Sequence, residues 1–285
     1  MESTSEYNWS WFRENMVKSL YKAEEQMPKT LGYYRKLDEV VCKLIETPTN
    51  PLKDVPQYLV AYDMSVRAFR LATSGIYLAL SGYPDVAMGM KRAILEIVIR
   101  LLYMTSNAEE GAYGFLLDNA ERDIAHLEEI LKAREGPMVE IEKEIKLNIK
   151  WTRKLYSDIA AIAKKKGYDI ERAKKKYGKV RMSEMSRQVN LMDIYKTSYA
   201  FESRYVHSRM FYDTDAMHVE GNLMAYEMGP IEKGNCSAVH DILMILMTAV
   251  DLACALAGKE SAKAICEKLE GEMKRDYDAL VKECG

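Results

Sequence analysis

Three polar side chains follow one another at four-residue intervals in the segment Leu191–Phe211. They are the phenol of Tyr199, the hydroxyl of Ser203 and the imidazole of His207. Residues four apart lie on one face of a helix, so the spacing predicts a single polar row. A histidine titrates near neutral pH, and with a hydroxyl one turn away it has the chemistry of a base and nucleophile pair. The same row is typical of a structural network between buried helices.

Two arginines border this row. Arg204 and Arg209 could bind an anion, which makes Arg209 a candidate ligand-binding residue. The catalytic candidates are His207, Ser203 and Arg204. The spacing of Ser203 and His207 implies no oxyanion donors, which favours binding over acyl transfer.

A second charged pair lies in the segment Asp85–Met104, which has the most apolar composition among the predicted helices of this region. Arg92 and Glu96 are four residues apart and are surrounded by aliphatic side chains. A buried ion pair needs partners, because an unpaired charge is costly inside a protein. One hypothesis is that the pair faces His207 across the core, and the alternative is a surface pair of small energetic value.

Metal and cofactor chemistry lacks a motif in this sequence. There is no Glu-x-x-His unit, no HExxH and no CxxC, so we expect no metal site. There is also no GxxxxGK[ST] loop, and no cofactor is expected. Lys164–Arg181 is strongly basic and could attract nucleic acid, although a solvated hinge is the commoner role of such a stretch.

The composition favours helix throughout the chain. The 285 residues are 48% hydrophobic and 29% charged, with only 15 glycines and 7 prolines, and the net charge is −2. Five cysteines without close pairs suit reduced thiols in the cytoplasm. The N-terminus does not resemble a signal peptide. Ala238–Ala257 is long and apolar but contains His240, Asp241 and Asp251, so we interpret it as a buried helix and expect no membrane association.

The expected fold is all-α, a helical bundle with short loops. Residues 1–50 are expected to form an N-terminal helical hairpin packed on a main bundle of residues 51–285, as one continuous fold. No strand is predicted, and 211–235 is expected to be mostly loop. The predicted helices are 5–27, 30–46, 56–80, 85–104, 108–133, 137–167, 182–190 (with Ser183 as N-cap), 191–211, 237–257 and 261–282.

Two stretches resemble a known family. Ala87–Glu96 fits the pattern a-x-x-l-x-R-x-x-x-E, and Tyr199-x-x-x-Ser203-x-x-x-His207-Ser208 fits a second pattern. Both are similar to motifs of a microbial helical family called domain of unknown function 5677, over about residues 55–255. The resemblance implies an all-helical fold with a centre of Arg, Glu, Tyr, Ser and His, and no established activity.

A weaker resemblance is to the helical ribonucleases of the higher eukaryote and prokaryote nucleotide-binding class (HEPN). These use an arginine and a histidine with four to six residues between them, at a helical dimer interface. Here Arg204 is too close to His207, Arg122 is too close to His126, and Arg209 is too far from His218.

Three hypotheses follow from the sequence. The first is binding of a small anionic ligand or a partner at Arg92, Glu96, Tyr199, Ser203 and His207. The second is metal-independent RNA cleavage by His207 with a nearby arginine. The third is a non-catalytic scaffold that forms a homodimer through Met-bearing faces such as that of Met244 and Met247.

Overall fold

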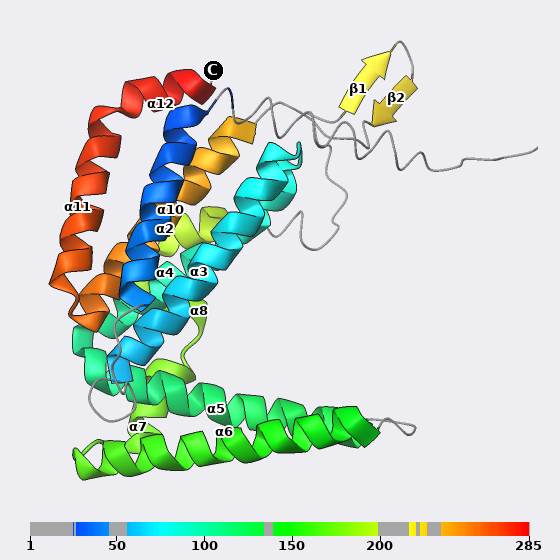
Figure 1. Cartoon of the computed structure of the whole chain (residues 1–285). Helices are drawn as coiled ribbons and strands as arrows, with labels where there is room; N and C mark the ends of the chain where they lie inside the picture. The colour runs from blue at the N-terminus through cyan, green and yellow to red at the C-terminus, as the bar shows by residue number, and fades with distance from the viewer. Residues whose placement is uncertain are drawn as a thin grey trace, which may run out of the picture.

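The computed structural model describes Glu25 and residues 27–45, 56–133, 139–198, 217–220, 223–226 and 235–284. These residues form a helical bundle, which confirms the predicted fold class (Figure 1). The elements are α2 (Pro28–Ile45), α3 (Pro56–Leu80), α4 (Pro84–Met104), η1 (Thr105–Asn107), α5 (Ala108–Ala133), α6 (Val139–Lys165), α7 (Ile170–Ala173), η2 (Lys174–Gly178), α8 (Met182–Gln188), a helix at 192–198, β1 (Met217–Glu220), β2 (Leu223–Tyr226), α10 (Asn235–Ala257), α11 (Glu260–Arg275) and α12 (Tyr277–Cys284).

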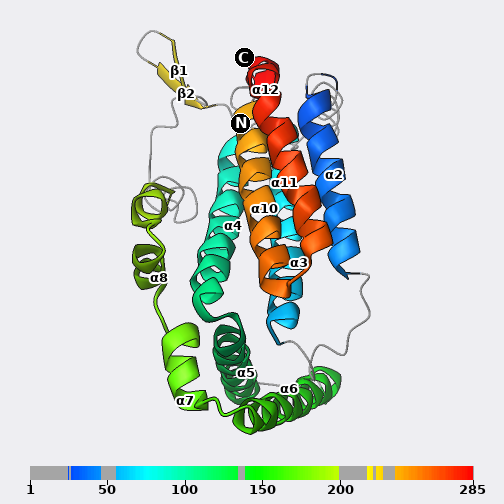
Figure 2. The same ribbon diagram turned by 90° about the vertical axis from the view of Figure 1, so that its left-hand side faces the viewer.

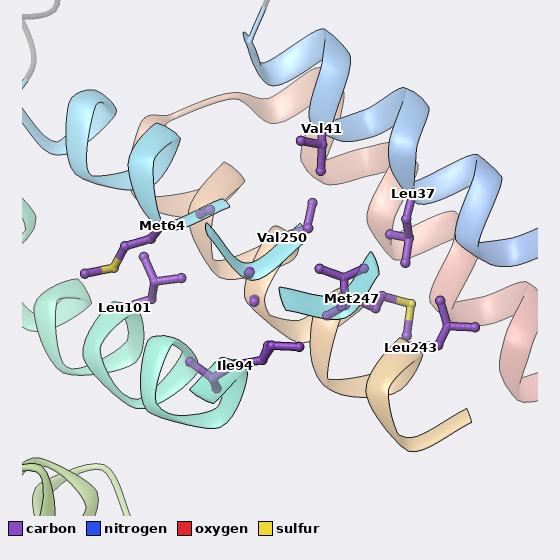
Figure 3. Close-up of a cluster of buried hydrophobic side chains, with 14 of the residues drawn as sticks. Leu37, Val41, Met64, Ile94, Leu101, Leu243, Met247 and Val250 are labelled. Atoms are coloured by element: carbon purple, nitrogen blue, oxygen red, sulfur yellow. The ribbon is translucent and has the colours of Figure 1, made fainter. Parts of the chain in front are cut away.

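The core forms where α10 packs between α3 and α4. Proline opens both α3 and α4, where its missing N–H leaves no hydrogen bond unmade. Gly82 closes the turn between these two helices at φ +89°, a conformation that glycine adopts at no steric cost. Figure 3 shows Ile94, Leu243 and Met247 in one apolar cluster with residues of α2 and α3.

The helix α2 belongs to the same bundle, because its contacts are with α10, α11 and α3. Leu37 and Val40 are buried in the shared core. Tyr33 donates a hydrogen bond of 3.1 Å to Asp276, and Lys36 pairs with Glu272 at 2.7 Å. Of the other expected helix of the N-terminal hairpin, 5–27, only Glu25 and Met27 lie within the described residues.

Among the described residues, α10 is the helix with the composition of a membrane span. Cys236–Ala257 is long and apolar enough to cross a bilayer, and 56% of its most apolar window is buried inside the bundle. Ile242, Leu243 and Leu246 are fully buried against the neighbouring helices. This agrees with the interpretation as a core helix, because burial within the bundle accounts for much of the apolar composition.

The helices α5 and α6 form a hairpin that crosses one end of the bundle, with α6 as the outer layer (Figures 1 and 2). A second, smaller core joins the two helices through Tyr113, Leu117, Ile159 and Ala163. The helix α6 packs mainly on α5 and, with fewer contacts, on α7, so much of its surface is exposed.

The basic stretch Lys164–Arg181 is docked on α5. It contains the short helix α7 and the π-helical turn η2, neither of which the sequence pattern predicts. The side chain of Lys174 is almost fully buried and pairs with Glu121 at 3.0 Å and with Glu171 at 2.7 Å. Three more lysines pair with acidic residues of α5: Lys166 with Glu109, Lys176 with Glu110 and Lys179 with Glu121.

Two glycines permit this close docking. A Cβ on Gly114 would lie 2.3 Å from the carbonyl oxygen of Ala173, and a Cβ on Gly178 would lie 2.2 Å from Cβ of Asp118. Both distances are far below van der Waals contact, so any larger residue would push α7 and η2 away from α5.

Several local predictions were wrong. The predicted helix 261–282 is broken at Asp276 into α11 and α12, and the N-cap of α8 is Arg181 rather than Ser183. Two short strands pair antiparallel, with Met217 opposite Tyr226, in a region where no strand was expected. Cys236 is in a disulfide, whereas Cys42, Cys254 and Cys266 are free thiols, so the expectation of only reduced cysteines holds for these three alone.

Candidate functional site

The predicted pair of Arg92 and Glu96 forms as an ion pair within α4. Nε of Arg92 lies 3.5 Å from the Glu96 carboxylate, and the two side chains are 17% and 35% exposed. The pair is therefore partly buried, between the two alternatives that the sequence left open. Arg100 continues the same four-residue spacing, which extends the charged row along α4.

Arg100 opens into a cavity of about 220 Å³ between α3, α4 and α5. Arginines from all three helices meet there: Arg67 from α3, Arg100 from α4 and Arg122 from α5. The full lining is Asp63, Met64, Arg67, Ile97, Arg100, Phe115, Asn119, Arg122 and Asp123. With three arginines and two aspartates the lining carries one net positive charge, beside an apolar wall.

Two of these arginines have carboxylate partners on their own helices. Arg67 pairs with Asp63 at 3.0 Å, and Arg122 lies 2.5 Å from the buried carboxylate of Asp118. Arg122 also donates a hydrogen bond of 3.0 Å to the amide oxygen of Asn119. Both guanidinium groups are thereby held at the rim of the cavity, where more than half of each side chain is exposed.

Arg100 differs from these two. It is half-buried, its guanidinium carbon lies 5.8 Å from the centre of the Phe115 ring, and among the described residues no carboxylate comes within ion-pair distance. Burial lowers the pKa of Arg100, and the nearby charge of Arg122 lowers it further, while Glu96 and Asp118 act in the opposite direction. The guanidinium still stays protonated at neutral pH, because the ordinary pKa of arginine lies far above 7. Arg100 is therefore a partly desolvated cation whose charge the neighbouring carboxylates balance only in part.

The other sequence-predicted residues lie outside the described residues. Tyr199, Ser203, Arg204, His207 and Arg209 belong to this group. The proposed approach of His207 to Arg92 and Glu96 therefore stays a prediction. The described part of the expected helix, 192–198, is helical.

The Met-bearing face proposed for dimerisation is used inside the bundle. Met247 is 4% exposed and belongs to the main core, and the partly buried Met244 packs against that core. Met247 is therefore used in the chain's own core, and a homodimer through the partly exposed Met244 stays a prediction.

The cavity was missed in the sequence because its arginines come from three separate helices. No local motif links Arg67, Arg100 and Arg122. One signal was present, since Arg92, Glu96 and Arg100 follow one another at four-residue intervals in the same predicted helix. Extending the charged pair by one turn would have pointed to Arg100.

Fold and site together define a helical bundle protein with an arginine-lined cavity between three of its helices. The chain belongs to a family of unknown function, DUF5677, whose model matches residues 58–217. This confirms the resemblance seen in the sequence, although the match ends earlier than residue 255. No curated protein and no solved structure matches the chain.

The family match includes every residue that lines the cavity, since these lie between Asp63 and Asp123. It leaves out α2 and the C-terminal helices α10, α11 and α12. Because α10 fills the core against α3 and α4, residues outside the match help to hold the cavity in shape.

Proposed function

We propose that this protein binds a small anionic molecule in the cavity between α3, α4 and α5, with Arg100 as the principal ligand-binding residue. The observation that carries the proposal is the half-buried guanidinium of Arg100, which has no ion-pair partner among the described residues. A buried charge is costly unless it is paired, and an anion in the cavity would supply that pairing.

The size of the cavity limits the ligand. Drug-sized molecules occupy pockets of roughly 300–1,000 Å³, and this cavity has about 220 Å³. A phosphate, or a small organic molecule with a phosphate or carboxylate group, therefore fits the space. The planar fork of an arginine binds both groups with two parallel hydrogen bonds.

Binding suits the lining better than catalysis. The described side chains that line the cavity include no histidine, cysteine, serine or lysine, so the lining offers none of these usual bases and nucleophiles. Phe115, Ile97 and Met64 supply an apolar wall against which the organic part of a ligand can pack. The RNA-cleaving alternative depends on His207 and stays a prediction.

The test is calorimetric titration of the purified protein with inorganic phosphate, citrate and a sugar phosphate. We expect at least one of these anions to bind, and Arg100→Met to weaken that binding at least about tenfold, because a charged hydrogen bond contributes about 1.5–3 kcal/mol. Arg70→Met is the matched control, since Arg70 is an exposed arginine on α3 that does not line the cavity.

Two results would overturn the proposal. One is a wild-type protein that binds none of the three anions. The other is an Arg100→Met protein that keeps its thermal transition and still binds as tightly as wild type. In the same assay, His207→Ala and Arg92→Ala test whether the residues predicted from the sequence contribute to the ligand site.

A further inference from the structure

The outer face of α6 carries an exposed apolar row. Leu147, Trp151 and Leu155 are four residues apart, and they are 51%, 61% and 36% exposed. Large side chains gathered on one face of a helix are typical of an interaction surface rather than of ordinary solvent exposure. The buried residues Ile145, Ile149 and Ile159 on the other face already supply the contact with α5.

Charged residues extend this row in a coiled-coil pattern. Glu144, Leu147, Trp151, Lys154 and Asp158 follow one another in steps of three and four residues, which is the spacing of a seam between two packed helices. Glu144 forms no ion pair with any residue that the structure describes. The ammonium of Lys154 lies 5.8 Å from the centre of the Trp151 ring.

We propose that this face of α6 binds the same face of a second copy of the chain, with the two α6 helices antiparallel. A two-fold axis that crosses the helix near residue 149 brings Leu147 opposite the partner's Trp151, and Glu144 opposite the partner's Lys154. The symmetry makes each contact twice. The interface then has an apolar centre, and on each side of it one glutamate of one copy pairs with one lysine of the other.

Charge complementarity selects this arrangement over a parallel one. In a parallel pair with equal register, Glu144 would meet Glu144, and Lys154 would meet Lys154, and like charges repel. The antiparallel register turns both of these contacts into attractive pairs. One layer further out, Asp158 would lie near the acidic residue at position 140, so the favourable contacts are confined to the middle of the helix.

The position of α6 leaves room for a second copy. Among the described residues, α6 is the outermost layer at its end of the bundle, and the main bundle lies on the opposite side of α5 (Figures 1 and 2). Its contacts with the other described elements are mainly with α5, with a few to α7. Two molecules can therefore meet through their α6 helices without a collision between the bundles.

The size of the contact predicts a weak dimer. The 27 residues of α6 span about 40 Å along the helix axis. With the axis near residue 149, only residues 139–159 of the two copies overlap, over about 30 Å of helix. One third of the helix surface there is roughly 350 Å² per copy, so the total of roughly 700 Å² lies below the range of stable interfaces and suits only a weak dimer. We therefore expect an equilibrium between monomer and dimer that depends on protein concentration.

The experiment is sedimentation velocity of the full chain from about 5 to about 500 µM, a range suited to a weak interface. Wild type should change from monomer to dimer across this range, and Trp151→Asp should remain monomeric. Tyr77→Asp is the control, because Tyr77 is also a large exposed side chain, 51% exposed, but lies on α3. This variant should dimerise as wild type does.

A charge exchange tests the register. Glu144→Lys alone and Lys154→Glu alone each bring like charges together, so each should raise the dimer dissociation constant about tenfold or more. The double variant E144K/K154E restores opposite charges and should recover nearly the wild-type constant. A parallel dimer would show no such recovery.

Three outcomes would overturn the proposal: a wild-type protein that stays monomeric at the highest concentration, a dimer that is unchanged by Trp151→Asp, or a double exchange that does not restore association. The proposal would also be overturned if this face of α6 bound RNA while the protein remained monomeric, because the partner of the face would then be nucleic acid. Circular dichroism of each variant confirms that the helices are intact.

Discussion

Replacing Gly114 with alanine tests the docking of the basic segment on α5. The new Cβ would lie 2.3 Å from the backbone oxygen of Ala173 and 3.2 Å from Cβ of Tyr177. Ordinary van der Waals contact begins at 3.4 Å, so α7 and η2 would have to move by about 1 Å. The obstacle is a backbone atom, and no rotation of a side chain can relieve the contact.

The expected cost combines three contributions. Overpacking of this kind costs about 1–3 kcal/mol. The movement also weakens the hydrogen bond of 3.0 Å from Tyr103 to the carbonyl oxygen of Lys176, which contributes about 1 kcal/mol more. Alanine regains about 1 kcal/mol as a better helix former than glycine. We therefore expect Gly114→Ala to lower the free energy of unfolding by about 2 kcal/mol.

The assay is urea denaturation followed by far-UV circular dichroism. Gly271→Ala in α11 is the control, because a Cβ there meets nothing within 4 Å. The control should gain about 0.5–1 kcal/mol from helix propensity alone. If Gly114→Ala were as stable as the control, the basic segment would not be seated against α5 in solution.

Three further predictions concern ionisable side chains and their exposure to solvent. Asp251 is partly buried and its Oδ1 accepts no hydrogen bond from the described residues, and burial raises the pKa of this carboxyl. The charged form that Asp251 has at pH 7 is therefore less stable in the folded protein than in the unfolded chain, so Asp251→Asn should add stability at pH 7, by about 0.5 kcal/mol after solvent screening. That gain should disappear as the pH falls through the raised pKa towards 4 in parallel denaturation curves, and an equal gain at both pH values would contradict it. Lys174→Met should cost about 1–2 kcal/mol in the same curves, because it removes the buried cation shared by Glu121 and Glu171, whereas Lys165→Met, a change of an exposed lysine, should cost almost nothing. Cys42 is exposed and should be alkylated in the native protein, while the buried thiols of Cys254 and Cys266 should react only on unfolding, and peptide mass spectrometry that found all three labelled at one rate would refute this.

Helices with strong boundary residues could be predicted closely from the sequence. The predicted bounds of α3 and α5 agree with the structure. For α3 the reason is clear, because Pro56 marks its start and the Ser-Gly-Tyr-Pro turn after Leu80 marks its end. The break at Asp276 was missed, since the residues on both sides keep helical periodicity. Local patterns do not record a change in chain direction that tertiary packing imposes.

Long-range contacts explain what the sequence could not reveal. Lys164–Arg181 has the composition of a solvated hinge, but its lysines meet Glu109, Glu110 and Glu121, which lie far earlier in the chain. The cavity has the same origin, because its three arginines are adjacent only after α3, α4 and α5 have packed. The ion pair of Arg92 and Glu96 was predictable, because both residues lie on one helix.

The most direct test of the anion site is a crystal of this protein soaked in selenate, with an anomalous difference map at the selenium edge. We predict a selenium peak in the cavity between α3, α4 and α5, with a selenate oxygen within hydrogen-bond distance of the Arg100 guanidinium. A map in which selenate binds elsewhere on the protein, while the cavity at Arg100 contains only water, would contradict the proposed function.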